Sequence, residues 1–319
     1  MDRLDAMSTV VAVAEAGSLS AAARQLKAPL ATVSRKVSDL ESHLGTKLFI
    51  RTSRKVGLTD AGTSYVAAAK RILADVNEAE RAASGEYAAP TGELVVTAPV
   101  GLGRVHLIPI LTDFFSAYPD IDVRLVLADR VMNLADDHID VALRVGALPD
   151  SSLIAIRVGG VRRVLCASPD YLSRRGTPKS LDELAAHDCI SNSVFLASDT
   201  WRFLKDGAEV SIPIRSRLVV SHIETACDAA SAGIGIAAMM SYHAAAALAD
   251  GTLTTVLDEF QPPGFPVHLV YAAGRFLPIK LRAFLDFTAP RLKARLQTGA
   301  EAVRHLGPAK APNASSLAE

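Results

Sequence analysis

The sequence predicts an α+β protein of several domains, in which a small helical N-terminal domain is followed by a long helix and a larger α/β domain. Three observations predict this architecture. Apolar residues recur at helical spacing in three runs before residue 45, a longer helical run follows Asp60, and beyond Gly92 short apolar runs alternate with helical segments. The length of 319 residues also favours more than one domain.

Two short helices are predicted to open the chain. Gly17 is placed to end the first of them in a left-handed conformation. Ser18 or Ser20 can cap the second helix, which is rich in alanine. The apolar stripe predicted for the first helix consists of Leu4, Met7, Val10, Val11 and Ala14.

A third helix is predicted to start at Pro29 and to turn an apolar stripe toward the core. Its other face carries only short or cationic side chains, which do not hold a helix out of the major groove of DNA. This face is therefore a candidate recognition surface. The stripe consists of Leu30, Val33, Val37, Leu40 and Leu44, and the opposite face of Ala31, Thr32, Ser34, Arg35, Lys36 and Ser38.

The region around this helix is basic, although the whole chain has a formal net charge of +0. Residues 24–58 hold eight Lys or Arg and only two acids, Asp39 and Glu41, which indicates a polyanionic partner. Gly45 is predicted to end the third helix. Residues 46–59 then have the pattern of a short extended ribbon, whose cations suit a wing beside the helix.

Five ordered motifs in this region resemble the LysR-type transcriptional regulators. They are AGSLSAAARQL at 16–26, VSRKV at 33–37, LESHLG at 40–45, LFIR at 48–51 and LTDAG at 58–62. The resemblance implies that residues 1–59 form a winged helix-turn-helix DNA-binding domain. It assigns to DNA contact Ser18 near a phosphate, Leu30, Ala31, Thr32, Ser34, Arg35 and Lys36 at the major groove, and Arg51 and Arg54 at the backbone or minor groove.

A long linker helix is predicted over residues 60–89. Its apolar positions alternate in steps of four and three, which is the repeat of a two-helix seam. The same stripe would also serve a helix that lies on the core of its own domain. The resemblance favours a dimerisation helix, because this linker pairs two chains in LysR-type proteins. The predicted seam consists of Tyr65, Ala69, Ile72, Val76 and Ala79.

Beyond Gly92 the alternation of apolar runs and helices predicts an α/β domain. Residues 140–146, 167–172 and 232–237 also match the LysR pattern, which implies an effector-binding domain at 90–300 with the two-lobed fold of periplasmic solute-binding proteins. Lobe one is assigned to 92–161 and 267–295, lobe two to 162–266, and 301–319 to a disordered tail. The predicted strands are 94–97, 121–127, 139–143, 154–158, 161–167, 218–220, 234–238 and 267–271.

The ligand is expected in the cleft between the lobes. The loop after the first strand of this domain is predicted to offer free backbone amides at a helix N-terminus, which favours a carboxylate or another anion. For some of the expected contact residues a structural role is the alternative to effector contact. Ser191 and Asn192 would then satisfy backbone groups in a turn, Arg144 would belong to a surface ion pair, and His222 would cap a helix. The effector contacts carried over by motif position are Thr97, Ala98, Pro99, Val100, Arg144, Val145, Gly146, Ser191, Asn192, Ser221, His222 and Ile234.

No catalytic, metal or cofactor site is predicted. The histidines have no metal-ligand spacing to Cys or carboxylates, no Gly-x-Ser-x-Gly motif occurs, and the Gly101-x-Gly103 pair lacks the third glycine of a dinucleotide loop. The cysteines, Cys166, Cys189 and Cys227, are odd in number and widely spaced, which favours a reducing compartment. Buried packing of these thiols is the favoured interpretation, and oxidant sensing is the alternative.

The N-terminus lacks the pattern of a secretion signal, so we expect a cytoplasmic protein. Between Asp228 and Asp250 no residue is charged, and a buried strand followed by an alanine-rich helix is favoured over a membrane span. The expected partners are operator DNA, a small-molecule effector, further copies of this chain in a dimer or tetramer, and RNA polymerase. A transport-associated solute-binding protein and an α/β enzyme with a DNA-binding appendage are the rival interpretations.

Overall fold

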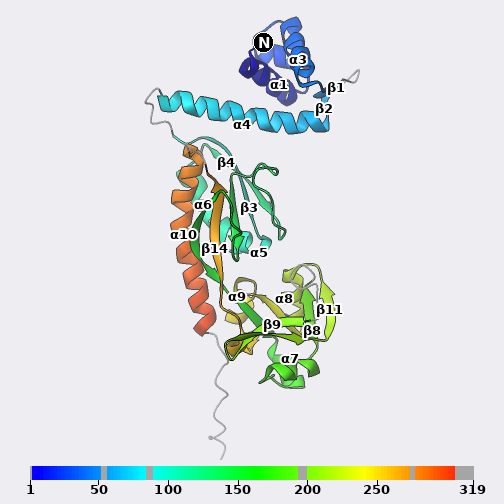
Figure 1. Ribbon diagram of the computed structural model, residues 1–319, viewed down its shortest axis with the longest axis vertical. Helices are drawn as coiled ribbons and strands as arrows, with labels where there is room; N and C mark the ends of the chain where they lie inside the picture. The colour runs from blue at the N-terminus through cyan, green and yellow to red at the C-terminus, as the bar shows by residue number, and fades with distance from the viewer. Residues whose placement is uncertain (1, 52–55, 84–88, 193–199, 274–276, 306–319) are drawn as a thin grey trace, which may run out of the picture. The chain divides into compact units, whose positions relative to one another are not determined.

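The computed structural model describes residues 2–51, 56–83, 89–192, 200–273 and 277–305. It divides into two compact units, residues 1–89 and 90–319. Figure 1 colours the first unit from blue to cyan.

The first unit has a core of three short helices, a two-stranded ribbon and a longer helix. Gly17 ends the first helix with a φ of 66°, which is the predicted left-handed conformation. The Ser18 hydroxyl accepts a hydrogen bond of 3.1 Å from the Ala21 amide, so Ser18 rather than Ser20 caps the second helix. The elements are α1 (Arg3–Ala16), α2 (Leu19–Gln25), α3 (Leu30–Leu44), β1 (Phe49–Arg51), β2 (Val56–Leu58) and α4 (Asp60–Ala83).

The apolar stripe predicted for α3 is right in its middle and wrong at both ends. Val33, Val37 and Leu40 are buried, but Leu30 is 50% and Leu44 38% exposed. An α-helix has 3.6 residues per turn, so a stripe with steps of three and four drifts around it. The last buried position is therefore Glu41, which is 4% exposed.

The stripe predicted for α1 is displaced in the same way. Val10 is fully buried as expected, whereas Leu4 is 40% exposed and Met7, Val11 and Ala14 are half-buried. The other residues that α1 buries are Ala6, Thr9, Ala12 and Val13. Small side chains on this face allow the neighbouring helices to approach α1 closely.

The N-terminal half of α4 packs on α1 of its own unit. Ala69 is 1% exposed in this contact, and Lys70 Nζ lies 2.6 Å from Glu15 Oε1. Further along the helix, Ile72 is 41% exposed and Val76 is half-buried. The first part of the α4 stripe thus covers the core of its own unit, as the second interpretation expects, and Ile72 stays exposed.

The second unit contains two five-stranded sheets, one in each lobe (Figure 1). The lobe-one sheet has the order β4-β3-β5-β14-β6, in which β3 runs parallel to β4 and β5, and β14 runs antiparallel to β5 and β6. Its elements are β3 (Gly92–Ala98), α5 (Val100–Leu102), the π-helix η1 (Gly103–Leu107), α6 (Ile108–Ala117), β4 (Ile121–Leu127), β5 (Val141–Val145), β6 (Leu153–Val161), β14 (Phe265–Ala272) and α10 (Ile279–His305).

The lobe-two sheet has the order β11-β8-β12-β7-β13, and the hairpin of β9 and β10 is separate from it. Its core includes the fully buried Trp201 and Phe203 from β9. The elements are β7 (Arg163–Ala167), α7 (Pro169–Arg175), η2 (Leu181–Ala186), β8 (Cys189–Asn192), β9 (Thr200–Lys205), β10 (Ala208–Pro213), β11 (Ser216–Val220), α8 (Ile223–Ser231), β12 (Ile236–Met240), α9 (Ser241–Ala249), β13 (Thr254–Val256) and η3 (Asp258–Phe260).

Each of the eight predicted strands corresponds to an observed strand, with ends displaced by up to three residues. The strands β8, β9, β10 and β13 lie outside these eight, and β8 replaces the turn considered for Ser191 and Asn192. Between Asp228 and Asp250, β12 and α9 confirm the buried strand and alanine-rich helix. In the described part of the chain, no single helix is long and apolar enough to cross a membrane, although α1 and α2 meet the criterion as a pair bent by 116°.

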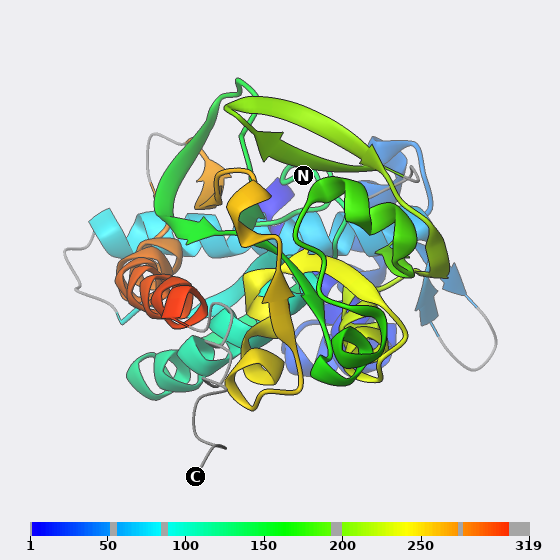
Figure 2. The same cartoon turned by 90° about the horizontal axis from the view of Figure 1, so that it is seen from below.

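The chain passes between the two lobes twice. It leaves lobe one at the end of β6 and returns to it at the start of β14, so residues 162–264 lie between two strands of one sheet. Helix α10, which Figure 2 shows almost end-on in orange and red, packs on β6, α6 and α9. It therefore touches lobe one and, through α9, the part of lobe two nearest to it.

Candidate functional site

The outward face of α3 lies open to solvent. Ala31, Arg35 and Ser38 are exposed, and Thr32 and Ser34 are half-buried. Arg35 forms no ion pair with any residue that the structure describes. A cation with no internal partner, between short polar side chains, is free to contact phosphate or the edge of a base.

Two other cations of the basic segment, Lys36 and Lys47, are less available than the sequence suggests. Lys36 Nζ lies 2.6 Å from Asp5 Oδ2, and Lys47 Nζ lies 2.7 Å from Glu41 Oε2. Asp5 lies outside the basic segment in sequence and reaches Lys36 only through the packing of α1 on α3. Only the backbone of Arg51 is described, at the end of β1, and Arg54 lies outside the described residues.

Glu41 fixes the start of the ribbon to α3. This structural role was not predicted from the sequence. Its Oε1 accepts hydrogen bonds from the amides of Leu48, at 2.9 Å, and Phe49, at 3.2 Å. Burial alone would raise the pKa of Glu41, but the hydrogen bonds from Lys47, Leu48 and Phe49 outweigh it and the net shift is downward. The signal was available in the sequence, because Glu41 follows Val37 by four residues on the buried face.

In the second unit, five of the predicted effector residues line one pocket of about 140 Å³. This pocket, which we name the β5 pocket, also receives the loop after β4 and, from lobe two, Met240 and Tyr242. The Arg144 guanidinium donates to the carbonyl of Met132, and burial lowers the pKa of Arg144. The predicted residues in the pocket are Thr97, Ala98, Pro99, Arg144 and Val145.

The prediction of free backbone amides at the N-terminus of the helix after β3 is wrong. The Val100 amide donates a hydrogen bond of 3.0 Å to Asp129 Oδ1, so a carboxylate of the chain already occupies it. The Thr97 hydroxyl donates to the Val126 carbonyl at 2.8 Å and is used within the sheet. Helix α5 has only three residues, too few for a strong dipole at its N-terminus. Val100 and Gly146 do not line the β5 pocket.

A larger pocket of about 720 Å³ adjoins lobe two, and Met240 lines it together with the β5 pocket. We name it the β9 pocket. Its wall is mainly apolar and includes Phe203 and Phe265. Arg163 lies over the Phe203 ring at 5.2 Å, and burial lowers the pKa of Arg163 to about 10. The β5 and β9 pockets share the lining residue Met240, and together they are the candidate cleft.

The predicted lobe-two contacts line neither of these pockets. Ser191 and Asn192 are buried in β8, and the Ser191 hydroxyl bonds to that of Ser216. His222 occupies the N-cap position of α8, but its Nδ1 shares a hydrogen bond of 2.7 Å with the Ser221 hydroxyl and does not cap the helix. Ile234 is 38% exposed.

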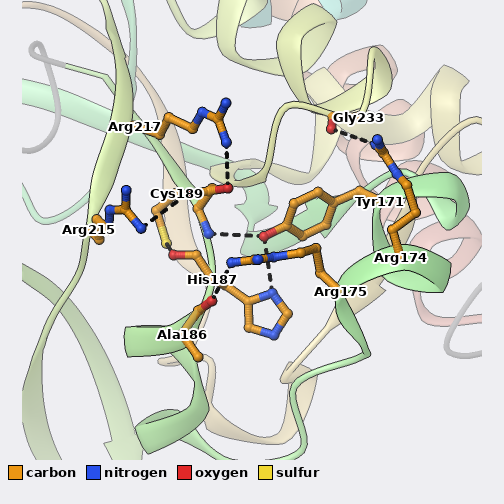
Figure 3. A network of polar contacts seen from close by, with 10 residues as sticks. Tyr171, Arg174, Arg175, Ala186, His187, Cys189, Arg215, Arg217 and Gly233 are labelled. Atoms are coloured by element: carbon orange, nitrogen blue, oxygen red, sulfur yellow. Dashed lines mark hydrogen bonds and ion pairs between the residues drawn. The ribbon is translucent and has the colours of Figure 1, made fainter.

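A polar network, drawn in Figure 3, stiffens lobe two around the start of β8. The Tyr171 hydroxyl accepts a hydrogen bond of 2.9 Å from the Asp188 amide and lies 3.1 Å from His187 Nδ1. The buried Asp188 carboxylate lies 2.9 Å from Arg217 Nη1 and 3.8 Å from Arg215 Nη1. These contacts hold β8 against β11 and α7.

The cysteines are packed in lobe two. Cys166 and Cys189 are buried and Cys227 is half-buried. Burial raises the pKa of all three thiols, that of Cys227 to about 11 and that of Cys189 to about 12. Among the described residues, no group of three or more His, Cys, Asp or Glu side chains is placed to hold a metal ion.

Comparison with known proteins places both units in one family. Residues 4–63 match the bacterial regulatory helix-turn-helix proteins of the lysR family, and residues 88–293 match the LysR substrate binding domain. The chain is 33% identical over 300 residues to the probable HTH-type transcriptional regulator LtrA of Klebsiella pneumoniae, covering 92% of this chain and 97% of the relative.

Two full-length structures are similar to it. CrgA, a LysR-type transcriptional regulator from Neisseria meningitidis, is 33% identical with a TM-score of 0.59 and matches 90% of this chain and 98% of its own. The Vibrio cholerae virulence activator AphB is 29% identical with a TM-score of 0.58 and matches 89% of this chain and 98% of its own.

Proposed function

The chain belongs to the LysR family of DNA-binding transcriptional regulators, which carry a ligand-binding regulatory domain, and from this premise we propose how its own residues divide the work. The outward face of α3 reads the operator in the major groove through Thr32, Ser34 and Arg35. Ser18 contacts a phosphate, and Arg51 and Arg54 contact the backbone beside the wing.

The single observation that carries this proposal is that Arg35 is exposed and has no ion pair among the described residues. It is exposed on α3, and the ion pairs of the described residues leave it unused, whereas Lys36 on the same helix is paired with Asp5. A guanidinium can donate two parallel hydrogen bonds to guanine or to a phosphate. Leu30, Ala31 and Lys36 complete the contact surface around it.

We further propose that the effector binds in the cleft formed by the β5 and β9 pockets. Arg144 supplies positive charge at one end, and the apolar wall around Phe203 and Phe265 supplies contact for a hydrocarbon body. An anionic effector, such as a small carboxylate, fits this arrangement. Binding across the lobes shifts their relative position, which changes the geometry of the paired reading heads.

We propose that the seam of α4 pairs two chains, with the exposed Ile72 at the contact and Val76 and Ala79 further along the helix; the side chain of Ala79 lies outside the described part of the chain. Two heads then reach one operator, as a dimer or a tetramer. We also propose a cytoplasmic location, contact with RNA polymerase at the promoter and no catalytic activity. Operator binding, effector binding and oligomer formation are properties of the family.

The test is a titration of the purified full chain with a labelled duplex from its own upstream region, followed by fluorescence anisotropy. We expect Arg35→Ala to weaken specific binding by about 1–3 kcal/mol, the cost of one bidentate base contact. The matched control is Arg282→Ala, which removes the same charge from an exposed position in the second unit. Affinity should fall steeply with salt, because each contacted phosphate releases counterions. Equal affinity of Arg35→Ala and wild type refutes the proposed readout.

A further inference from the structure

Lys36 on the helix α3 is held by an acid from another helix. Its Nζ donates a hydrogen bond of 2.7 Å to Asp5 Oδ1 and lies 2.6 Å from Asp5 Oδ2, so both carboxylate oxygens contact the ammonium group. The Lys36 side chain is 30% exposed and the Asp5 side chain 48%. Arg35, the preceding residue, has no ion pair among the described residues. Two neighbouring cations of one helix are therefore in different electrostatic states.

Lys36 lies beside the outward face of α3, on the side where α1 packs. It follows Thr32 by four residues, which is about one helical turn, so the two side chains project from the same side of the helix. Thr32 is one of the residues proposed to read the operator. A helix in the major groove has the two phosphate backbones on either side of it, so Lys36 is placed toward a backbone and not toward the base edges.

Asp5 is fixed in the first turn of α1. Its amide donates a hydrogen bond of 3.3 Å to the Asp2 carboxylate, and its carbonyl accepts one of 2.8 Å from the Thr9 hydroxyl. A carboxylate in the first turn of a helix is also stabilised by the helix dipole. The position of Asp5 is thus fixed independently of Lys36, and its carboxylate stays in place when the lysine side chain leaves.

The Asp5 carboxylate and a DNA phosphate compete for the same ammonium group. Both are anions that accept charge-assisted hydrogen bonds. A lysine that is already paired brings no net charge to the DNA, and it displaces a counterion only after it exchanges the carboxylate for a phosphate. That exchange leaves Asp5 without its partner beside a polyanion. Lys36 therefore adds far less to DNA affinity than a free cation at the same place would add.

We propose that Asp5 is a positioning residue that limits the affinity of the protein for DNA by holding Lys36 away from the phosphates. The inference rests on the proposed function, because it takes α3 as the helix in the major groove. A phosphate contact carries no information on base sequence. Asp5 thus sets the absolute affinity and its salt dependence, whereas Arg35 sets the preference between sequences.

The test measures DNA binding of the full chain by fluorescence anisotropy at several salt concentrations. One labelled duplex comes from its own upstream region, and the other is a scrambled duplex of the same length and composition. Asp5→Asn should tighten binding to both duplexes by the same factor, about three- to tenfold at about 0.1 M salt for each head that contacts the DNA. The slope of log affinity against log salt concentration should steepen by about 0.9 per head. Asp5→Ser serves the same purpose should Asp5→Asn not fold.

A double-mutant cycle tests whether the gain comes from Lys36 itself. In the Lys36→Gln background, Asp5→Asn should change the affinity by less than about twofold, because no ammonium group remains to be freed. The matched control is Glu15→Gln. Glu15 lies on the same helix, is also 48% exposed and is also 2.6 Å from a lysine, Lys70 of α4. This substitution breaks an equivalent ion pair that does not involve α3, and it should give neither the gain nor the steeper slope.

The inference is overturned if Asp5→Asn gives no gain, if the gain persists in the Lys36→Gln background, or if Glu15→Gln gives the same gain. Arg35→Ala separates this result from the proposed readout. An unchanged preference for the upstream duplex in Arg35→Ala, together with an intact Asp5→Asn gain, refutes the readout alone. A lost preference in Arg35→Ala without any Asp5→Asn gain refutes the positioning role alone, and a chain that binds neither duplex refutes both.

Discussion

We expect the replacement of Glu41 by alanine to loosen the first strand of the ribbon from α3. The carboxylate is 4% exposed, and one of its oxygens accepts the amides of both Leu48 and Phe49. Alanine leaves these two buried donors without an acceptor, at about 1–3 kcal/mol each, so the predicted loss is about 2–6 kcal/mol. The contact with Lys47 adds little, because that lysine is 73% exposed.

The assay is hydrogen exchange of the Leu48 and Phe49 amides in the full chain, which avoids the assumption that two units unfold in one step. A loss of about 2 kcal/mol or more accelerates exchange about 30-fold or more. Glu41→Gln keeps an acceptor and should give a smaller acceleration. Asp39→Ala, an exposed acid on the same helix, is the control and should have no effect.

The same carboxylate predicts a pH dependence. The folded-state pKa of Glu41 lies below its ordinary value of 4.5, so its stabilisation is fully present above pH 4.5 and is lost as pH falls through the folded-state pKa. The difference in exchange between wild type and Glu41→Ala should therefore narrow in acid. Unchanged exchange of both amides in Glu41→Ala at neutral pH would refute the reasoning.

Two further outcomes follow from close packing and burial. A Cβ atom on Gly62 would lie 1.9 Å from the carbonyl oxygen of Leu48, the residue before β1. Gly62→Ala should therefore displace α4 from this segment and lower the thermal midpoint of the first unit, which calorimetry measures. An unchanged midpoint would contradict this close contact. The raised pKa values of Cys166, Cys189 and Cys227 leave little thiolate at pH 8, so a thiol reagent should react slowly with the native chain and with three groups per chain after denaturation. Rapid reaction of one native thiol would instead favour oxidant sensing.

The order of helices and strands followed from the sequence because each depends on local patterns. Gly17 and Ser18 mark a helix end and a helix start through backbone conformation and one hydrogen bond, both within a few residues. The alternation beyond Gly92 was sufficient to place eight strands. Their ends were displaced because strand ends depend on the neighbours in the sheet, which are distant in sequence.

The site was less predictable because it is made by tertiary contacts. The Val100 amide looked free from its position before a helix, but Asp129, from a loop beyond another strand, occupies it. In the sequence, Lys36 has no nearby acid and is a candidate DNA contact, but the fold brings Asp5 from α1 into an ion pair with it. Met240 and Tyr242 enter the β5 pocket from the other lobe, and no pattern in their own segment indicates this.

The position of β14 between β5 and β6 constrains the order in which the protein can fold during its synthesis on the ribosome. β14 belongs to the middle of the lobe-one sheet, yet it is synthesised after all of lobe two. Before β14 is made, β5 has β3 as its one neighbour in this sheet and β6 has none, so the lobe-one sheet can close only after an entire lobe has been synthesised. The contacts of α10 with β6 and α9 also form only at that last step.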